Sequence, residues 1–234
     1  DNIWIGGNGQ GDSHVLKFTR DGRFLMQVGE PGQGVDSNSM THFSRVTKVS
    51  FDQNGDEAFI GDGYGNKRIA VFDEHGQYLR QWGRQATLEE TLAGTGGAFS
   101  YALHCIAISN EGLVYVCDRE GLRVQVFDKM GNFVRNIWVK TGNASLPDTR
   151  GTVWGLAFST DDAQRYLYVL DGRHEQVHIL DHASGEILSS FGRPGHQLGN
   201  FTVAHGLAVD SNGNIYVAES GTGRRVQRFN LVRN

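Results

Sequence analysis

The sequence is poor in proline and cysteine, with 3 and 2 residues respectively in a chain of 234. It has no apolar run approaching the roughly 18 residues that a transmembrane helix needs, so we expect no membrane span. The charges of the 26 acidic and 22 basic residues nearly cancel, which leaves a net charge of −4. Nucleic-acid-binding domains usually present a basic surface. The sequence therefore predicts no nucleic-acid partner.

The sequence also lacks an initiator methionine and a secretion signal, because it begins Asp1-Asn2-Ile3-Trp4. We therefore expect it to be a piece of a longer protein. Glycine, in contrast, is abundant: the 32 glycines are about twice the usual share and follow no Gly-X-Y period. Such a composition predicts many tight turns and hence many short strands.

A turn followed by a strand recurs along the chain, with its glycine at positions Gly22, Gly76, Gly131 and Gly185. The period is about 54 residues, and the segments around each turn alternate between apolar and polar residues. Four short antiparallel strands per unit are typical of a propeller blade. We predict a single all-β domain over residues 1–234, a β-propeller whose five units carry three, four, four, four and three strands, with no helix longer than a turn or two.

The two incomplete terminal units cannot together form one four-stranded blade, because each already has three strands. Open strand edges invite aggregation, and six blades at this period need about 324 residues. We therefore expect a six-bladed parent protein, of which about five blades are represented here and some N-terminal blade material is missing. A five-bladed ring with irregular closure is the alternative.

The two cysteines flank a predicted turn. If Ser109 pairs with Leu113 across that turn, the antiparallel register places Cys105 opposite Cys117. A cross-strand disulfide in an oxidising compartment and two reduced thiols in a buried hairpin are both compatible with this register.

Candidate functional residues occupy one repeat position, at the start of the first strand of each complete unit. First strands of propeller blades line the central channel, and this position holds Thr47, His104, Trp154 and His205. In a six-bladed ring the two histidines are about 120° apart, so a third histidine before Asp1 would complete the three-imidazole arrangement of catalytic zinc sites. Histidines that hydrogen-bond only to each other or to water are the structural alternative.

The loop after the second strand of each unit lies at the same end of the channel. Its recurring carboxylate is expected to cap turn amides, and its arginine to pack between blades, in particular Arg68, Arg123 and Arg225. Tyr64 and Arg119 stand outside this recurrence and are better functional candidates. A tyrosine beside a metal and an arginine could act as a base once its pKa is lowered.

The remaining histidines have no matched spacing. His174 is either an extra metal ligand or a histidine of a surface loop. The others are expected to be solvated on strand ends and turns, and they include His178 and His182.

On these residues the sequence resembles NHL repeats and, more narrowly, the propeller of peptidyl-α-hydroxyglycine α-amidating lyases, including bacterial relatives. The stretches that carry the resemblance are Asp62-Gly63-Tyr64, Leu103-His104, Asp118-Arg119-Glu120 and Ala204-His205-Gly206. The resemblance implies that Tyr64 is the catalytic tyrosine and Arg119 an active-site arginine. It implies that His104 and His205 are two of three zinc ligands, the third histidine and another arginine belonging to a segment before Asp1.

The resemblance further implies a secreted or periplasmic, zinc-dependent lyase that cleaves a peptidyl-α-hydroxyglycine-like carbinolamide into an amide and glyoxylate. The substrate, a peptide or a small molecule, would occupy the central channel. The sequence departs from the family at Leu103 and Ala204, where proline commonly precedes each histidine. It also has Gly206 where the animal enzymes place an aspartate ligand of calcium, so the expected structural calcium lacks that ligand.

Two alternative functions differ in how well they fit the sequence. A non-catalytic NHL propeller could bind a protein or glycan partner on one face, since this fold serves many binding modules. A calcium-dependent lactonase-like propeller would need carboxylates and amides around its axis, whereas the visible ring is Thr, His, Trp and His.

Overall fold

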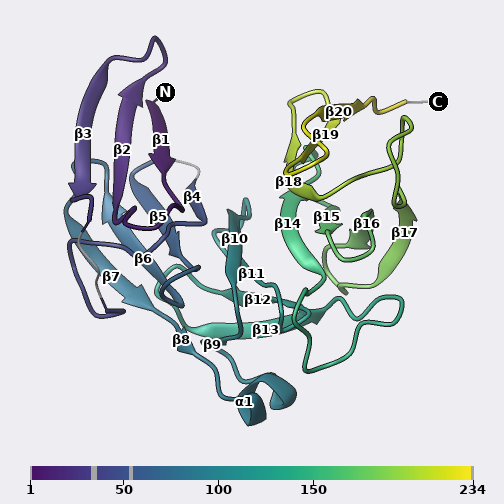
Figure 1. The fold of residues 1–234 in the computed structure, drawn as a ribbon, viewed down its shortest axis with the longest axis horizontal. Helices are drawn as coiled ribbons and strands as arrows, with labels where there is room; N and C mark the ends of the chain where they lie inside the picture. Colours follow the sequence, from purple (N-terminus) through teal and green to yellow (C-terminus); the bar gives the residue numbers. More distant parts are fainter. Residues whose placement is uncertain (1, 33–35, 53–54, 233–234) are drawn as a thin grey trace.

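The computed structural model describes residues 2–32, 36–52 and 55–232. Five antiparallel sheets stand side by side around a central axis, and Figure 1 shows that the sheets containing the two termini lie at the two ends of the arc. Within every blade, strands that are consecutive in the sequence are hydrogen-bonded neighbours. This arrangement confirms the predicted all-β propeller.

The first three blades contain three, four and four strands. The first blade consists of β1 (Asn2–Gly6), β2 (His14–Thr19) and β3 (Phe24–Gly29). The second consists of β4 (Lys48–Phe51), β5 (Glu57–Asp62), β6 (Arg68–Asp73) and β7 (Tyr78–Trp82). The third consists of β10 (Leu103–Ile108), β11 (Val114–Asp118), β12 (Arg123–Phe127) and β13 (Phe133–Trp138).

The last two blades contain four and three strands, so the predicted strand count of each unit is confirmed. The fourth consists of β14 (Val153–Phe158), β15 (Tyr166–Asp171), β16 (Gln176–Asp181) and β17 (Ile187–Phe191). The fifth consists of β18 (Ala204–Val209), β19 (Ile215–Glu219) and β20 (Val226–Phe229).

A short parallel pair and one helix connect the second and third blades. β8 (Arg84–Gln85) pairs with β9 (Ala98–Phe99), and α1 (Leu88–Ala93) lies between them in the sequence. A Thr87–Glu90 capping box closes the start of α1. None of the residues with described positions forms a helix long and apolar enough to cross a membrane.

The repeated glycines allow the turn between the third and fourth strands of a blade. Gly22, Gly76, Gly131 and Gly185 all have φ between 77° and 89°, a left-handed conformation that disfavours other residues. At Gly131 a β-carbon would also lie 2.7 Å from the indole of Trp82. Conformation therefore favours glycine at all four positions, and close side-chain neighbours add a steric reason at Gly76, Gly131 and Gly185 but not at Gly22.

The hydrophobic core lies between neighbouring blades rather than at the channel. Phe59 and Val71 of the second blade, for example, pack with Val116 and Phe127 of the third, and all four side chains are fully buried. Each sheet is therefore stabilised by the next sheet in the ring.

A carboxylate–arginine pair joins the second and third strands of three blades; it is fully buried in the second and third blades, and in the fifth the arginine is partly exposed. The nitrogen–oxygen distances are 2.9, 2.8 and 2.6 Å in the pairs Asp62–Arg68, Asp118–Arg123 and Glu219–Arg225. Each arginine also donates to carbonyl oxygens of the segment that leads in from the preceding blade; for example, Arg68 donates to Ser37 and His42 at 2.9 and 2.7 Å. The recurring Asp and Arg thus have a structural role, but in these three blades the carboxylate pairs with the arginine and accepts from an amide of the incoming segment, rather than capping its own turn.

The fourth blade has histidines in place of this arginine. Gln176 occupies the arginine position, and Oδ2 of Asp171 instead contacts His174 Nδ1 at 2.9 Å and His178 Nε2 at 3.1 Å. His178 is 3% exposed, so the prediction that it is solvated is wrong. It replaces a glutamine that bonds to the same carboxylate in the third and fifth blades.

The third blade is cross-linked within its inner hairpin. Ser109 and Leu113 flank a three-residue turn, with the Ser109 amide donating to the Leu113 carbonyl at 2.9 Å. Cys105 and Cys117 are joined as a disulfide with their α-carbons 4.9 Å apart. The structure therefore selects the disulfide from the two alternatives that the predicted register allowed.

Replacing both cysteines by alanine should lower the free energy of unfolding by about 2–3 kcal/mol, because the disulfide closes a loop of modest length in the unfolded chain. The measurement is urea unfolding followed by circular dichroism, and the folded spectrum should be unchanged. Dithiothreitol should lower the midpoint of the parent protein and leave that of the double variant unmoved. An identical midpoint for the parent with and without reductant would contradict the disulfide.

Replacing Arg123 by methionine should lower the free energy of unfolding by about 3–5 kcal/mol, because the fully buried Asp118 carboxylate would lose its cation. The exposed Arg228 of β20 is a matched control, and its replacement by methionine should change stability by less than about 0.5 kcal/mol. Equal small effects of the two variants in urea unfolding would show that the buried pair does not hold the blade together.

Candidate functional site

A bulge recurs at the inner edge of three successive blades. The β14–β15 register shifts by one residue between Val153 and Gly155, and the β18–β19 register shifts between Ala204 and Gly206. The β10–β11 register shifts between Leu103 and Ile106. The residues within these shifts are Trp154, His205 and the pair His104–Cys105. A bulged residue leaves the regular ladder, so its side chain is re-aimed.

The buried carboxylates hold the backbone immediately before these bulges. Asp118 accepts a hydrogen bond from the Ser100 amide at 2.8 Å, and Glu219 accepts one from the Thr202 amide at 2.7 Å. The same carboxylates end the second strands. Arg119 directly follows Asp118, so one ion pair positions both the histidine strand and the arginine loop of the third blade.

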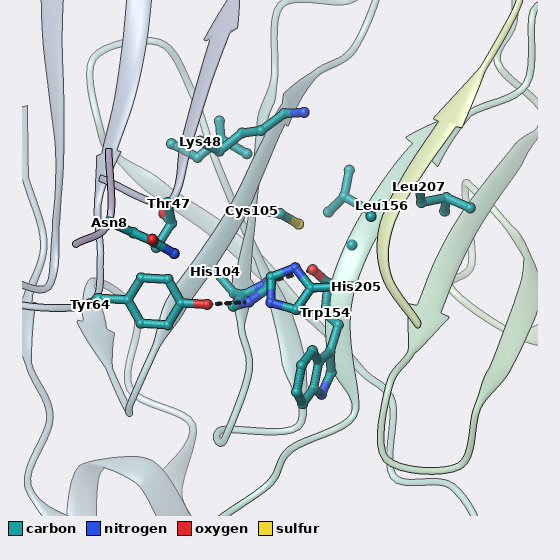
Figure 2. A pocket seen from close by; sticks show the side chains of 13 residues that line it. Asn8, Thr47, Lys48, Tyr64, His104, Cys105, Trp154, Leu156, His205 and Leu207 are labelled. Carbon is teal, nitrogen blue, oxygen red and sulfur yellow. Dashed lines mark hydrogen bonds between the residues drawn. The ribbon is translucent and has the colours of Figure 1, made fainter. Parts of the chain in front are cut away.

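The two histidines and the tryptophan gather at one cavity. The ring centres of His104 and His205 are 4.9 Å apart, and each lies 5.4 Å from that of Trp154. Tyr64 and Asn8 also line this cavity, and Figure 2 shows the Tyr64 hydroxyl pointing at His104. The repeat position predicted to face the channel therefore does face one common space.

Hydrogen bonds define the tautomer of His104. Its Nδ1 lies 2.6 Å from the main-chain carbonyl oxygen of Trp154, and since a carbonyl only accepts, Nδ1 carries the proton. The neutral ring then has its lone pair on Nε2, where the Tyr64 hydroxyl donates at 2.9 Å. Burial, followed by the charges of Arg119 and His205, lowers the pKa of His104 to about 3, so the ring is neutral at neutral pH.

Tyr64 lies in an environment with opposing electrostatic effects. Burial raises the pKa of the Tyr64 phenol above its usual value, while the positive charges of Arg119 and Arg45 oppose that rise. The net direction is upward, whereas the sequence suggested a lowered pKa. Burial is the stronger effect because the phenolate would lose much of its hydration.

Arg119 lies behind the cavity. Its guanidinium carbon is 4.8 Å from the ring centre of Trp154 and 5.5 Å from that of Tyr101, and its Nη2 is 3.3 Å from the Glu120 carboxylate. The side chain is 8% exposed, and within the described part of the chain its Nε has no hydrogen-bond partner. A buried cation with an unused donor is suited to meet negative charge.

His174 does not line the cavity. Its ring bonds to Asp171 through Nδ1, and its Nε2 lies 3.3 Å from the Asn143 side-chain oxygen. Sequence reasoning also missed two neighbours of Tyr64, namely Arg45 and Tyr101. Neither falls at a repeat-equivalent position, so no periodic signal identifies them.

The residues present fit two positions of a zinc site. A carbonyl holds the Nδ1–H of His104, which is the usual second-shell pattern of metal-binding histidines, and a metal at Nε2 would replace the hydrogen bond from the Tyr64 hydroxyl. His205 supplies a second imidazole nearby. Residues 2–32, 36–52 and 55–232 contain no group of three or more His, Cys, Asp or Glu side chains that could hold a metal.

Comparisons with known proteins agree with the architecture. The NHL repeat model matches residues 103–127 and 201–229, in the third and fifth blades. Virginiamycin B lyase from Staphylococcus aureus, solved as an inactive variant with quinupristin, superposes with a TM-score of 0.59 at 13% identity, covering 98% of this chain and 66% of that one. At this identity the structural match shows the shared propeller fold.

Relatives found by sequence bear the names of peptide-amidating enzymes. A peptidyl-glycine α-amidating monooxygenase of Xenopus laevis is 30% identical over 76% of this chain, which spans 20% of that protein's length. A probable peptidyl-α-hydroxyglycine α-amidating lyase of Caenorhabditis elegans is 27% identical over 92% of this chain and is covered over 57% of its own length. The chain is thus an NHL-repeat β-propeller with modest sequence similarity to peptidyl-α-hydroxyglycine α-amidating lyases.

Proposed function

We propose that this propeller is the catalytic domain of a zinc-dependent lyase that cleaves a peptidyl-α-hydroxyglycine-like carbinolamide into an amide and glyoxylate. The observation that carries the proposal is the convergence of the His104 and His205 imidazoles, with ring centres 4.9 Å apart, and the Tyr64 side chain on one cavity. The names of two sequence relatives, from Caenorhabditis elegans and Drosophila melanogaster, support the same reaction class.

The reaction moves one proton from oxygen to nitrogen and breaks one bond. Tyr64 is neutral at rest, so its phenol first releases a proton to water. The phenolate then takes the proton of the substrate α-hydroxyl, the oxygen electrons form the carbonyl of glyoxylate, and the C–N bond breaks. The departing amide nitrogen takes that proton from Tyr64, which returns to the phenolate. The guanidiniums of Arg119 and Arg45 favour the phenolate and offset charge that develops on the oxygen.

Zinc held by His104, His205 and a third ligand would supply a Lewis acid that lowers the pKa of the substrate hydroxyl. The described lining of the cavity contains no carboxylate, which is the ligand calcium prefers, so neither a calcium site nor the lactonase-like function gains support there. The disulfide supports a secreted or periplasmic location, because such bonds persist in oxidising compartments.

In the full-length protein, replacing His104 by alanine should abolish stoichiometric zinc and lower lyase activity by at least about 100-fold, since it removes a metal ligand. Elemental analysis and a glyoxylate-release assay provide the two measurements. His75, which is exposed on a turn, is the matched control, and its replacement by alanine should retain both zinc and activity.

The fold should survive the His104 substitution, because the blade cores lie away from the channel. Full activity of the His104 variant would remove this histidine from the site. A parent protein that purifies without zinc and turns over no carbinolamide would instead favour the non-catalytic propeller that binds a protein or glycan.

Replacing Tyr64 by phenylalanine should leave zinc content and KM nearly unchanged and lower kcat by about 10²–10⁴-fold, because only the proton-transferring hydroxyl is lost. Steady-state kinetics with a peptidyl-α-hydroxyglycine substrate measures both constants. The same change at Tyr78, outside the cavity, is the control and should have no effect on kcat. Equal turnover by the Tyr64 variant and the parent would refute the role of this hydroxyl.

A further inference from the structure

Cations and tyrosines alternate beside the cavity. The guanidinium carbon of Arg45 lies 5.3 Å from the ring centre of Tyr64, and the Tyr64 and Tyr101 ring centres are 6.2 Å apart. On the other side, Lys67 Nζ and the Arg119 guanidinium lie 4.9 and 5.5 Å from the Tyr101 ring. Three positive side chains therefore surround two aromatic rings, an arrangement stabilised by cation–π attraction.

Two of these cations are already committed. Lys67 is 4% exposed, and its Nζ donates to the carbonyl oxygens of Asn66 and Tyr64 at 2.9 and 3.2 Å. Arg119 is buried and paired with Glu120 at 3.3 Å. Among these three cations Arg45 is the one that is not fully buried, and its side-chain hydrogen bond within the described residues uses Nε rather than the terminal nitrogens.

Arg45 has unused hydrogen-bonding capacity. Its Nε donates to the Asn8 carbonyl oxygen at 3.0 Å, and in the described portion of the chain no carboxylate forms an ion pair with its guanidinium. The residue as a whole is half-buried. A guanidinium in this setting can form a two-point contact with a carboxylate.

Arg45 contacts two residues that line the cavity. It bonds to Asn8 and lies against the ring of Tyr64, and both of these residues line the cavity. Its backbone is fixed at φ 66°, an uncommon conformation for arginine, with its amide bonded to Asp12 and its carbonyl to the Tyr64 amide. The guanidinium is therefore held at the margin of the cavity by the same loop that carries the catalytic tyrosine.

We propose that Arg45 is a specificity-determining residue that binds the substrate carboxylate adjacent to the hydroxyl-bearing carbon. This inference rests on the proposed lyase function and deepens it: the site selects carbinolamides that bear a free carboxylate over neutral ones of the same size. Arg119, which pairs with Glu120 through Nη2 but has no partner for its Nε among the described residues, would then meet the charge that develops on the substrate oxygen.

The test compares a peptidyl-α-hydroxyglycine with its methyl ester on the full-length zinc-loaded protein. Replacing Arg45 by glutamine should lower kcat/KM for the free acid by about 10–100-fold, mainly through KM, because a charged two-point contact is lost. The ester should change by less than twofold, and Arg45→Lys should restore part of the loss for the acid. The exposed Arg20 is the matched control, and its replacement by glutamine should affect neither substrate.

An equal loss on acid and ester would show that Arg45 only supports the loop, and no loss on either would place carboxylate recognition elsewhere. Both outcomes overturn the proposal. A second measurement is independent of turnover: tryptophan fluorescence of the metal-free protein titrated with N-acetylglycine and with its methylamide. The parent should bind the acid at least about tenfold more tightly than the methylamide, and Arg45→Gln should abolish that difference.

The two measurements separate the possible failures. Arg45-dependent binding of the acid by a protein that cleaves neither substrate would leave the carboxylate subsite standing and refute the lyase. Cleavage of the acid with identical constants for the parent and Arg45→Gln would leave the lyase standing and refute the subsite.

Discussion

The buried carboxylate at the end of the second strand is the interaction on which most of the architecture depends. In three blades it pairs with an arginine of the next strand. It also accepts a hydrogen bond from a main-chain amide of the segment that enters the blade. The arginine in turn donates to carbonyl oxygens of that incoming segment. One charged group therefore joins strand, loop and inter-blade connection in a place where water cannot substitute for any of the partners.

The site is built on this constraint. His104 and His205 follow the amides held by the carboxylates by four and three residues, and Tyr64 and Arg119 lie two residues and one residue beyond Asp62 and Asp118. The two histidines occupy one repeat position, while the candidate residues Tyr64 and Arg119 depart from the repeat. A site that uses rigid strand ends and short loops can hold groups in the narrow geometry that proton transfer requires.

Burial and positive charge together decide the protonation states in the cavity. Burial lowers the pKa of both histidines and raises that of Tyr64, so all three groups are neutral in the resting protein. Nearby arginines lower the pKa of the imidazoles further and counteract the effect of burial on the phenol. The same charges that keep His104 free to use its lone pair therefore assist formation of the Tyr64 phenolate.

The sequence by itself determined the blades, because strand alternation and turn glycines are patterns among neighbouring residues. The same patterns predicted the strand count, the Cys105–Cys117 register and the channel position of His104 and His205, since equivalent positions in a repeat share one environment. Tertiary structure alone brought Arg45 and Tyr101 to Tyr64, buried His178 against Asp171 and set the direction of the Tyr64 pKa. These features come from segments distant in sequence and from desolvation, and neither leaves a periodic signal that a single chain can display.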